Sequence, residues 1–257
     1  MGLQVGKFMS PIGQFVQNQH PSWINKLPMT PLGFGHDGAA PTSNVGMALR
    51  GGLPKIAGLR SNYVLFVANA PVYGKNEDNS IEGSLDTDGK TTSNGAQPTI
   101  GARYALNPVG GMEIGISGAI GEIVDVNNTL SIRDYSVMDI DFMYDLGAVA
   151  LKAEYVKQEV GTSTLNSIDP DGGVWEALYL QASYQFTNVA LEPVVRYSDY
   201  HNPDTKRNQI ALGLNYLFSN NLIGKFSYEF NENEDATVSS SDVTNNDILR
   251  AQLAFGF

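Results

Sequence analysis

The sequence contains no cysteine, only three histidines and no apolar run long enough to form a membrane-spanning helix. The absence of cysteine excludes disulfides, thiolate metal sites and cysteine nucleophiles. The longest apolar runs are interrupted by Gly, Glu, Lys or Asn, whereas a membrane helix needs about 20 consecutive apolar residues. Cysteine-dependent chemistry and α-helical membrane proteins are therefore excluded.

Positive charge is also scarce. The chain has a formal net charge of -11, which argues against a nucleic-acid partner because such a protein must neutralise phosphates. The first eight residues, MGLQVGKF, lack the basic region and apolar stretch of a secretory signal peptide.

What the sequence does contain is repeated alternation of apolar and polar residues. Residues 222–230, for example, place Leu222, Phe226 and Phe230 on one face and Lys225 and Glu229 on the other. A period of two predicts β-strands with one apolar face. Similar patterns predict twelve strands, near residues 3–8, 45–49, 63–67, 100–106, 112–120, 138–144, 149–155, 178–186, 189–197, 210–218, 222–230 and 250–257.

The connections between these strands alternate in length. Short turns near 53–58, 107–111 and 219–221 are expected to alternate with longer polar segments. The long segments are predicted at 9–44, 70–96, 121–134, 157–173, 199–207 and 231–246. Short turns at one end and long loops at the other are typical of outer-membrane β-barrels.

A soluble β-sandwich would show the same alternation, so the aromatic residues decide between the two folds. On the apolar face, some aromatics fall near the short turns, such as Tyr184 and Tyr216, and others near the long loops, such as Tyr197 and Tyr228. Aromatic side chains concentrate at both membrane interfaces. We therefore predict one all-β domain over residues 1–257, an antiparallel up-and-down transmembrane β-barrel of about twelve strands in the bacterial outer membrane.

In this fold the polar face of each strand lines the lumen. The expected pore-lining charges are nearly balanced, and comprise Arg50, Arg60, Arg103, Lys152, Arg196, Lys225 and Arg250 with Glu113, Asp139, Asp141, Glu154, Glu192 and Glu229. Balanced charge favours cross-strand ion pairs and weak selectivity. Arg196, Lys225 and Arg250 could alternatively form a basic track and give a weak preference for anions.

The beginning of the chain resembles the phosphate-selective porin O/P family. Gly6-Lys7-Phe8 followed by Pro11-Ile12-Gly13 is similar to the family's strand end and the start of its long inward loop, and 44–51 (NVGMALRG) is similar to the strand that follows. The resemblance implies a porin for small hydrophilic solutes or ions. It also implies that residues 9–44 fold into the pore, where Phe15, Trp23, Lys26 and Phe34 would form the constriction, and that the protein is a homotrimer. A loop packed on the rim or in a subunit contact is the alternative for 9–44.

The chain departs from the family in two respects. Family members have about sixteen strands, so this sequence either lacks four N-terminal strands and a signal peptide or is a divergent twelve-stranded relative. The dense pore Arg and Lys residues that phosphate selectivity requires are missing. Phosphate specificity is therefore not expected.

Other functions have weaker support. His20, His36 and His201 all fall in predicted loops, so we expect no catalytic site, no metal site and no cofactor. Asp86-Thr87-Asp88-Gly89 resembles part of a calcium loop but lacks the downstream Glu. The expected partners are outer-membrane lipid and lipopolysaccharide. A competing hypothesis is a barrel that forms a sheath around a partner such as a multihaem cytochrome.

Overall fold

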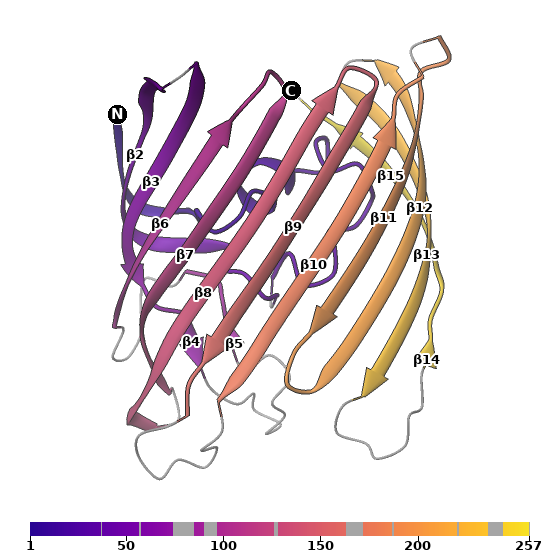
Figure 1. Cartoon of the computed structure of the whole chain (residues 1–257). Coiled ribbons are helices and arrows are strands. Elements are labelled where there is room, and N and C mark those ends of the chain that lie inside the picture. Colours follow the sequence, from indigo (N-terminus) through magenta and orange to yellow (C-terminus); the bar gives the residue numbers. More distant parts are fainter. Residues whose placement is uncertain are drawn as a thin grey trace.

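The computed structural model describes residues 1–36, 38–56, 58–73, 85–89, 97–125, 128–162, 172–186, 188–219, 221–235 and 244–256. They form one curved antiparallel sheet in which each long strand pairs with its neighbours in sequence (Figure 1). The long strands are β1 (Gly2–Met9), β2 (Ser43–Ile56), β3 (Leu59–Asn69), β6 (Pro98–Asn107), β7 (Met112–Asp125), β8 (Asn128–Leu146), β9 (Val149–Val160), β10 (Gly173–Tyr184), β11 (Leu191–His201), β12 (Thr205–Ser219), β13 (Leu222–Asp235) and β15 (Ile248–Phe255).

Three short strands complete the sheet. These are β4 (Val72–Tyr73), β5 (Leu85–Asp86) and β14 (Thr244–Asn245), and the one helical element is the five-residue π-helix η1 (Phe15–Gln19) within the described residues. The described part of the chain has no helix that is long and apolar enough to cross a membrane. Twelve long strands agree with the number that the alternation predicts. Within the described residues β1 pairs only with β2 and β15 only with β13, so the sheet is a barrel wall that is not closed.

The two faces of the wall differ in the way that the alternation predicts. On the convex outer face Leu212, Phe226 and Leu253 are 49%, 49% and 68% exposed. The neighbouring inward residues Ala211 and Glu229 are buried. Apolar side chains that are exposed over a whole sheet face require an apolar surrounding, which in a transmembrane barrel is lipid.

Several strands extend beyond the apolar band, and here the expected loop boundaries were wrong. Residues 121–134 were expected to be a polar loop, yet β7 continues to Asp125 and β8 begins at Asn128. Likewise β9 continues to Val160 and β13 to Asp235. Backbone hydrogen bonds between strands do not depend on side-chain hydrophobicity, so pairing continues where the alternation has already ended.

Candidate functional site: the lumen and the segment that crosses it

The segment between β1 and β2 lies on the concave inner face of the wall (Figure 1). It begins and ends at one point, because the Ser10 amide donates a 3.1 Å hydrogen bond to the Thr42 carbonyl. We refer to residues 10–42 as the inner segment. Its five prolines exclude it from the ladder, since proline has no N–H to donate.

The centre of the inner segment is an aromatic cluster rather than a surface exposed to the lumen. The rings of Phe15 and Phe34 pack edge-on against each other and against Tyr179 of β10, with centroid separations of 5.0 to 6.0 Å. All three side chains are almost fully buried. Of the four residues expected at the constriction, Phe15 and Phe34 therefore hold the segment on the wall, whereas Trp23 is 44% exposed.

The start of the inner segment is bound by side chains from β7 and β9. The Gly13 amide donates to the Ser117 hydroxyl at 2.9 Å, and the Phe15 amide donates to a Glu154 carboxylate oxygen at 2.8 Å. Gly13 has a φ of +68° and approaches the carboxylates of Glu154 and Asp139 so closely that a side chain would collide with them. Glycine is required here by both the backbone conformation and the space.

Arg103 neutralises the carboxylates beneath this contact. Its guanidinium forms a two-bond ion pair with Asp141, one bond at 2.9 Å, and an ion pair with Glu113 at 3.1 Å. Gln14 of the inner segment donates to the same Glu113 at 2.7 Å. Asp139 is fully buried beside this group, and neither of its carboxylate oxygens has a hydrogen-bond partner within the described residues.

The later part of the inner segment is bound mainly through its own carbonyl groups. Arg196 donates to the carbonyls of Met29 and Thr30 at 2.9 and 3.2 Å. Lys225 donates to the carbonyls of Ser22 and Asn25. Arg196 and Lys225 therefore bind the inner segment instead of forming the cross-strand ion pairs considered from the sequence.

Lys26 is the one Lys or Arg residue in the sequence of the inner segment, and it forms a 2.6 Å ion pair with Glu192 of β11. It lies close enough to Lys152 and Lys225 to interact with both electrostatically. The Lys152 ammonium forms no hydrogen bond within the described residues. We call Lys26, Lys152 and Lys225 the lysine group. With Glu192 and Asp145 as the carboxylates that act on it, the group leaves an excess of positive charge.

The remaining charges form no hydrogen bond or ion pair with the inner segment within the described residues. Arg250 of β15 pairs with Glu229 of β13 at 3.0 Å. Arg50 is half-buried on β2, and Arg60 is exposed near the short-turn end of β3. The thirteen expected pore-lining charges are thus divided among the wall beneath the inner segment, the lysine group and the opposite side of the lumen.

A cavity of about 470 Å³ lies between residues 29–36 and 38 of the inner segment and strands β11, β12, β13 and β15. We call it the amide cavity because Gln209, Asn231, Asn233 and Asn246 line it together with Arg207 and Arg250. These amides were not among the residues predicted to line the pore. Their inward positions on the alternating strands were the available signal, but uncharged polar residues are common on any lumen-facing surface.

The last part of the inner segment contacts the residues that follow the short strand β5. Thr42 and His36 both bind the Asp88 carboxylate, His36 at 2.8 Å. Partial burial opposes ionisation of Asp88, but these two hydrogen bonds and the charges of His36 and Lys7 outweigh it and lower the pKa of Asp88 below its ordinary value. The Gly89 amide also donates to the Ser43 hydroxyl at 2.9 Å.

Among the residues that the structure describes, the three histidines form no catalytic arrangement with a nucleophile. His36 faces Asp88, the His20 ring lies 6.4 Å from the His36 ring, and His201 contacts Asp199 at 3.0 Å. In the described residues, no three acidic or histidine side chains are grouped so that they could hold a metal ion.

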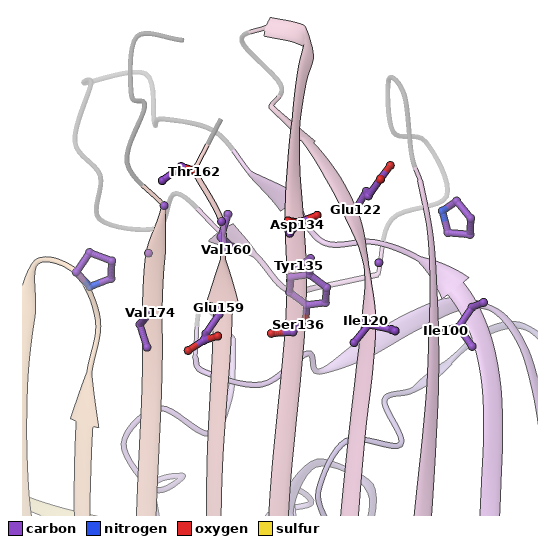
Figure 2. A pocket seen from close by; sticks show the side chains of 16 residues that line it. Ile100, Ile120, Glu122, Asp134, Tyr135, Ser136, Glu159, Val160, Thr162 and Val174 are labelled. Carbon is purple, nitrogen blue, oxygen red and sulfur yellow. The ribbon is translucent and has the colours of Figure 1, made fainter. Parts of the chain in front are cut away.

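The outer face carries a groove of about 1020 Å³ at the long-loop end of β6 to β10. Figure 2 shows Ile100 and Ile120 beside each other on neighbouring strands, with Glu122 and Asp134 nearer the loops. Glu122 and Asp134 are directly opposite each other in the β7–β8 pair. The groove thus joins the apolar band to a carboxylate-rich rim.

Solved structures with a similar fold are outer-membrane porins. The anion-selective porin from Comamonas acidovorans superposes with a TM-score of 0.61 at 14% identity, covering 98% of this chain and 71% of that one. OmpT of Vibrio cholerae, folded in vitro, gives a TM-score of 0.54 at 13% identity, covering 97% and 73%. Identities this low establish the fold alone. No curated protein matches the chain.

The family is established by sequence. Residues 116–257, more than half of the chain, match the family model described as phosphate-selective porin O and P. This match covers β8 to β15, whose outward residues form the apolar band and whose inward residues bind the inner segment. The fold and the match together identify a channel rather than an enzyme. The chain therefore belongs to the family of phosphate-selective porins O and P, and is an outer-membrane porin that allows passive diffusion through its lumen.

Proposed function

We propose that the pore conducts small hydrophilic solutes with a weak preference for anions, and that residues 9–44 narrow it. The observation that carries this proposal is the lysine group, which is held at the point where the inner segment crosses the lumen. Lys26 is 31% exposed at its side chain, so its charge acts on the water of the lumen. Two carboxylates, Glu192 and Asp145, act on three ammonium groups. The excess of positive charge at a narrow point sets ion preference.

Reversal potential in a salt gradient across a planar bilayer tests this proposal. The native protein is expected to favour chloride over potassium, and Lys26→Gln should reduce that preference because it leaves Glu192 with less compensation. Lys157→Gln removes the same charge from the outer face of β9, where Lys157 pairs with Glu159, and should leave the reversal potential unchanged. A native preference for potassium would contradict the proposal.

The proposal does not extend to phosphate selectivity. Arg103 and Arg196 are almost fully buried, and both are engaged, with carboxylates and with carbonyls of the inner segment respectively. Neither guanidinium is available to form an exposed row of phosphate ligands. We therefore propose a general anion preference, which is also the property named for the Comamonas acidovorans porin.

The sheath hypothesis is less compatible with the position of the inner segment. A barrel that surrounds a partner protein needs a wide lumen, whereas Phe34 and Leu27 bring the inner segment onto the concave face. A conducting channel formed by the isolated protein would favour the porin, and a non-conducting one would favour the sheath.

We also propose that the outer groove of Figure 2 contacts lipopolysaccharide. Its aliphatic part suits acyl chains. The facing Glu122 and Asp134 would repel each other, so a divalent cation shared with lipid phosphates would relieve that repulsion. Native mass spectrometry should show bound lipopolysaccharide that is reduced by a chelator and by the double variant Glu122→Gln with Asp134→Asn. Bound lipopolysaccharide that neither the chelator nor the double variant reduces would contradict this contact.

A homotrimer is the proposed assembly. On the described outer faces of β2, β3, β6 and β7, the long-loop ends carry aliphatic residues such as Val45, Val67 and Ile120 in place of the aromatics found on β9, β11 and β13. An outer surface without this aromatic belt suits protein contact better than a lipid interface. Native mass spectrometry in detergent should give a mass of three chains, and a single chain at all concentrations would contradict the proposal.

A further inference from the structure

The amide cavity lies on the side of the lumen that the inner segment leaves open. Residues 29–36 and 38 form one boundary, and inward residues of β11, β12, β13 and β15 form the other. Its volume of about 470 Å³ is within the range of small-molecule sites. A solute that passes the inner segment on this side meets the cavity.

Arg250 presents one edge of its guanidinium to this cavity. Its Nε donates to both carboxylate oxygens of Glu229 at 3.1 and 3.0 Å, which fixes the plane of the group. Within the described residues, its two terminal nitrogens form no hydrogen bond. A guanidinium edge held in this way matches the two oxygens of a carboxylate.

Gln209 supplies a buried acceptor beside that edge. Its Nε2 donates to Asn231 at 2.9 Å and is within 3.4 Å of Glu229, so the orientation of its amide is fixed. Its Oε1 is buried without a partner within the described residues, and the residue is 5% exposed. A buried acceptor without a donor is costly, and a ligand hydroxyl would satisfy it.

The charges around the cavity favour an anion. Arg207 and Arg250 line it, and Glu229, the one carboxylate among its described lining residues, is already paired with Arg250. The other polar groups are amides, which both donate and accept hydrogen bonds, as hydroxyl groups do. The lining thus combines a site for one carboxylate with several sites for hydroxyls.

We propose that the amide cavity is a solute-binding site for small hydroxylated carboxylates of the sugar-acid class. The carboxylate binds the terminal nitrogens of Arg250, and the hydroxyls bind Gln209 Oε1 and the amides of Asn233 and Asn246. The inference rests on the proposed anion-preferring pore and names the solute class that it holds. Binding here raises the local concentration of the solute at the lumen without any chemical step.

Solute-dependent block of single-channel current tests the site. In symmetric potassium chloride, D-gluconate should interrupt the current of the native channel in a saturable way. D-glucitol has the hydroxyls without the carboxylate, and propionate has a carboxylate without the hydroxyls. Each should block at least tenfold more weakly than gluconate, because each satisfies only part of the lining.

Variants separate the two halves of the site. Arg250→Lys keeps the charge opposite Glu229 but removes the planar edge, and should weaken gluconate block about tenfold. Gln209→Leu should weaken it several-fold while leaving propionate block unchanged. The matched control is Lys206→Gln, next to Arg207 but on the exposed outer face. Gluconate should block this variant as strongly as it blocks the native channel.

The outcomes distinguish this site from the proposed function. Block is measured on channels that already conduct, so absent conductance or a preference for potassium contradicts the anion-preferring porin. Equal block by gluconate and D-glucitol in a conducting, anion-preferring channel overturns the carboxylate site. Unchanged gluconate block in both Arg250→Lys and Gln209→Leu overturns it as well. If Arg250→Lys fails to fold, Gln209→Leu and the solute series still decide the question.

Discussion

The two sides of the lumen use the same kind of inward residues in opposite ways. On the β6 to β11 side, Arg103 is buried and pairs with Asp141, and the buried Glu154 and Arg196 bind the inner segment. On the β12 to β15 side, Lys225 also binds the inner segment, but Arg207 and Arg250 border an open cavity. Both sets arise from the same period-two alternation, so facing inward does not by itself make a charge available to a solute.

The difference shows what each charge contributes. A buried charge stabilises only if its partners are in place, and the partners of Arg196 and Lys225 are backbone carbonyls more than 160 residues away in the chain. The open side keeps guanidinium and amide groups in contact with water. We therefore expect substitutions on the first side to change stability and the width of the pore, and those on the second to change selectivity.

Removing the inner segment should have the largest effect. Because Ser10 and Thr42 are joined by a backbone hydrogen bond, residues 11–41 can be replaced by two glycines as a tight turn between β1 and β2. Single-channel conductance is expected to rise several-fold, since both sides of the lumen would then be open. An unchanged conductance would show that residues 9–44 do not narrow the pore.

Arg103→Ala should be the most destabilising single substitution on the covered side. It leaves the buried Asp141 and the partly buried Glu113 without their cation, and breaking a buried ion pair costs about 3–5 kcal/mol. Thermal unfolding in detergent measures the loss. Arg60→Ala, at an exposed position, is the control and should stay within about 0.5 kcal/mol of the native protein; equal losses in the two variants would contradict the assignment.

Phe34→Ala should release the inner segment while the wall stays folded. The ring is 1% exposed and packs against Phe15 and Tyr179, and its removal costs about 3 kcal/mol. Hydrogen exchange at the Ala39 amide, which bonds to the Gly33 carbonyl at 2.8 Å, should then accelerate about a hundredfold. Trp23→Ala, at a side chain 44% exposed, should accelerate it much less, and similar rates in both variants would count against the aromatic cluster.

The contact of Asp88 with His36 and Thr42 should give the smallest effect. Its pKa in the folded protein is below the ordinary value of 3.8, so the contact stabilises fully above that value and is lost as the pH falls through the lowered pKa. Hydrogen exchange of the Gly89 amide should accelerate over that acid range in the native protein. Asp88→Asn should show no such dependence, and an identical pH profile in both proteins would exclude this role.

The sequence predicted the wall well because one physical rule sets it. Lipid on one side and water on the other require alternation, and Leu212, Phe226 and Leu253 face outward as that rule predicts. The predicted ends of β7 and β8 were wrong because strand pairing continues above the lipid, where Glu122 and Asp134 no longer alternate with apolar residues.

The contacts of the inner segment could not be predicted. Its path has no repeat, and its hydrogen bonds join a backbone group to a side chain far along the sequence, as between Gly13 and Ser117. Which inward charges it would cover depends on that path. The sequence therefore located the charges of Arg196 and Arg250 on one face without showing that the first is covered and the second open.

The long sequence separation of these contacts also sets the order of assembly. Gly13 bonds to Ser117, Phe15 to Glu154, Met29 to Arg196 and Asn25 to Lys225. Each of these partners follows its residue in the chain by 104 to 200 residues. The inner segment precedes β7 to β13 in the chain, and its binding surface is complete only when those strands have paired. We therefore expect the segment to bind late, after strand pairing.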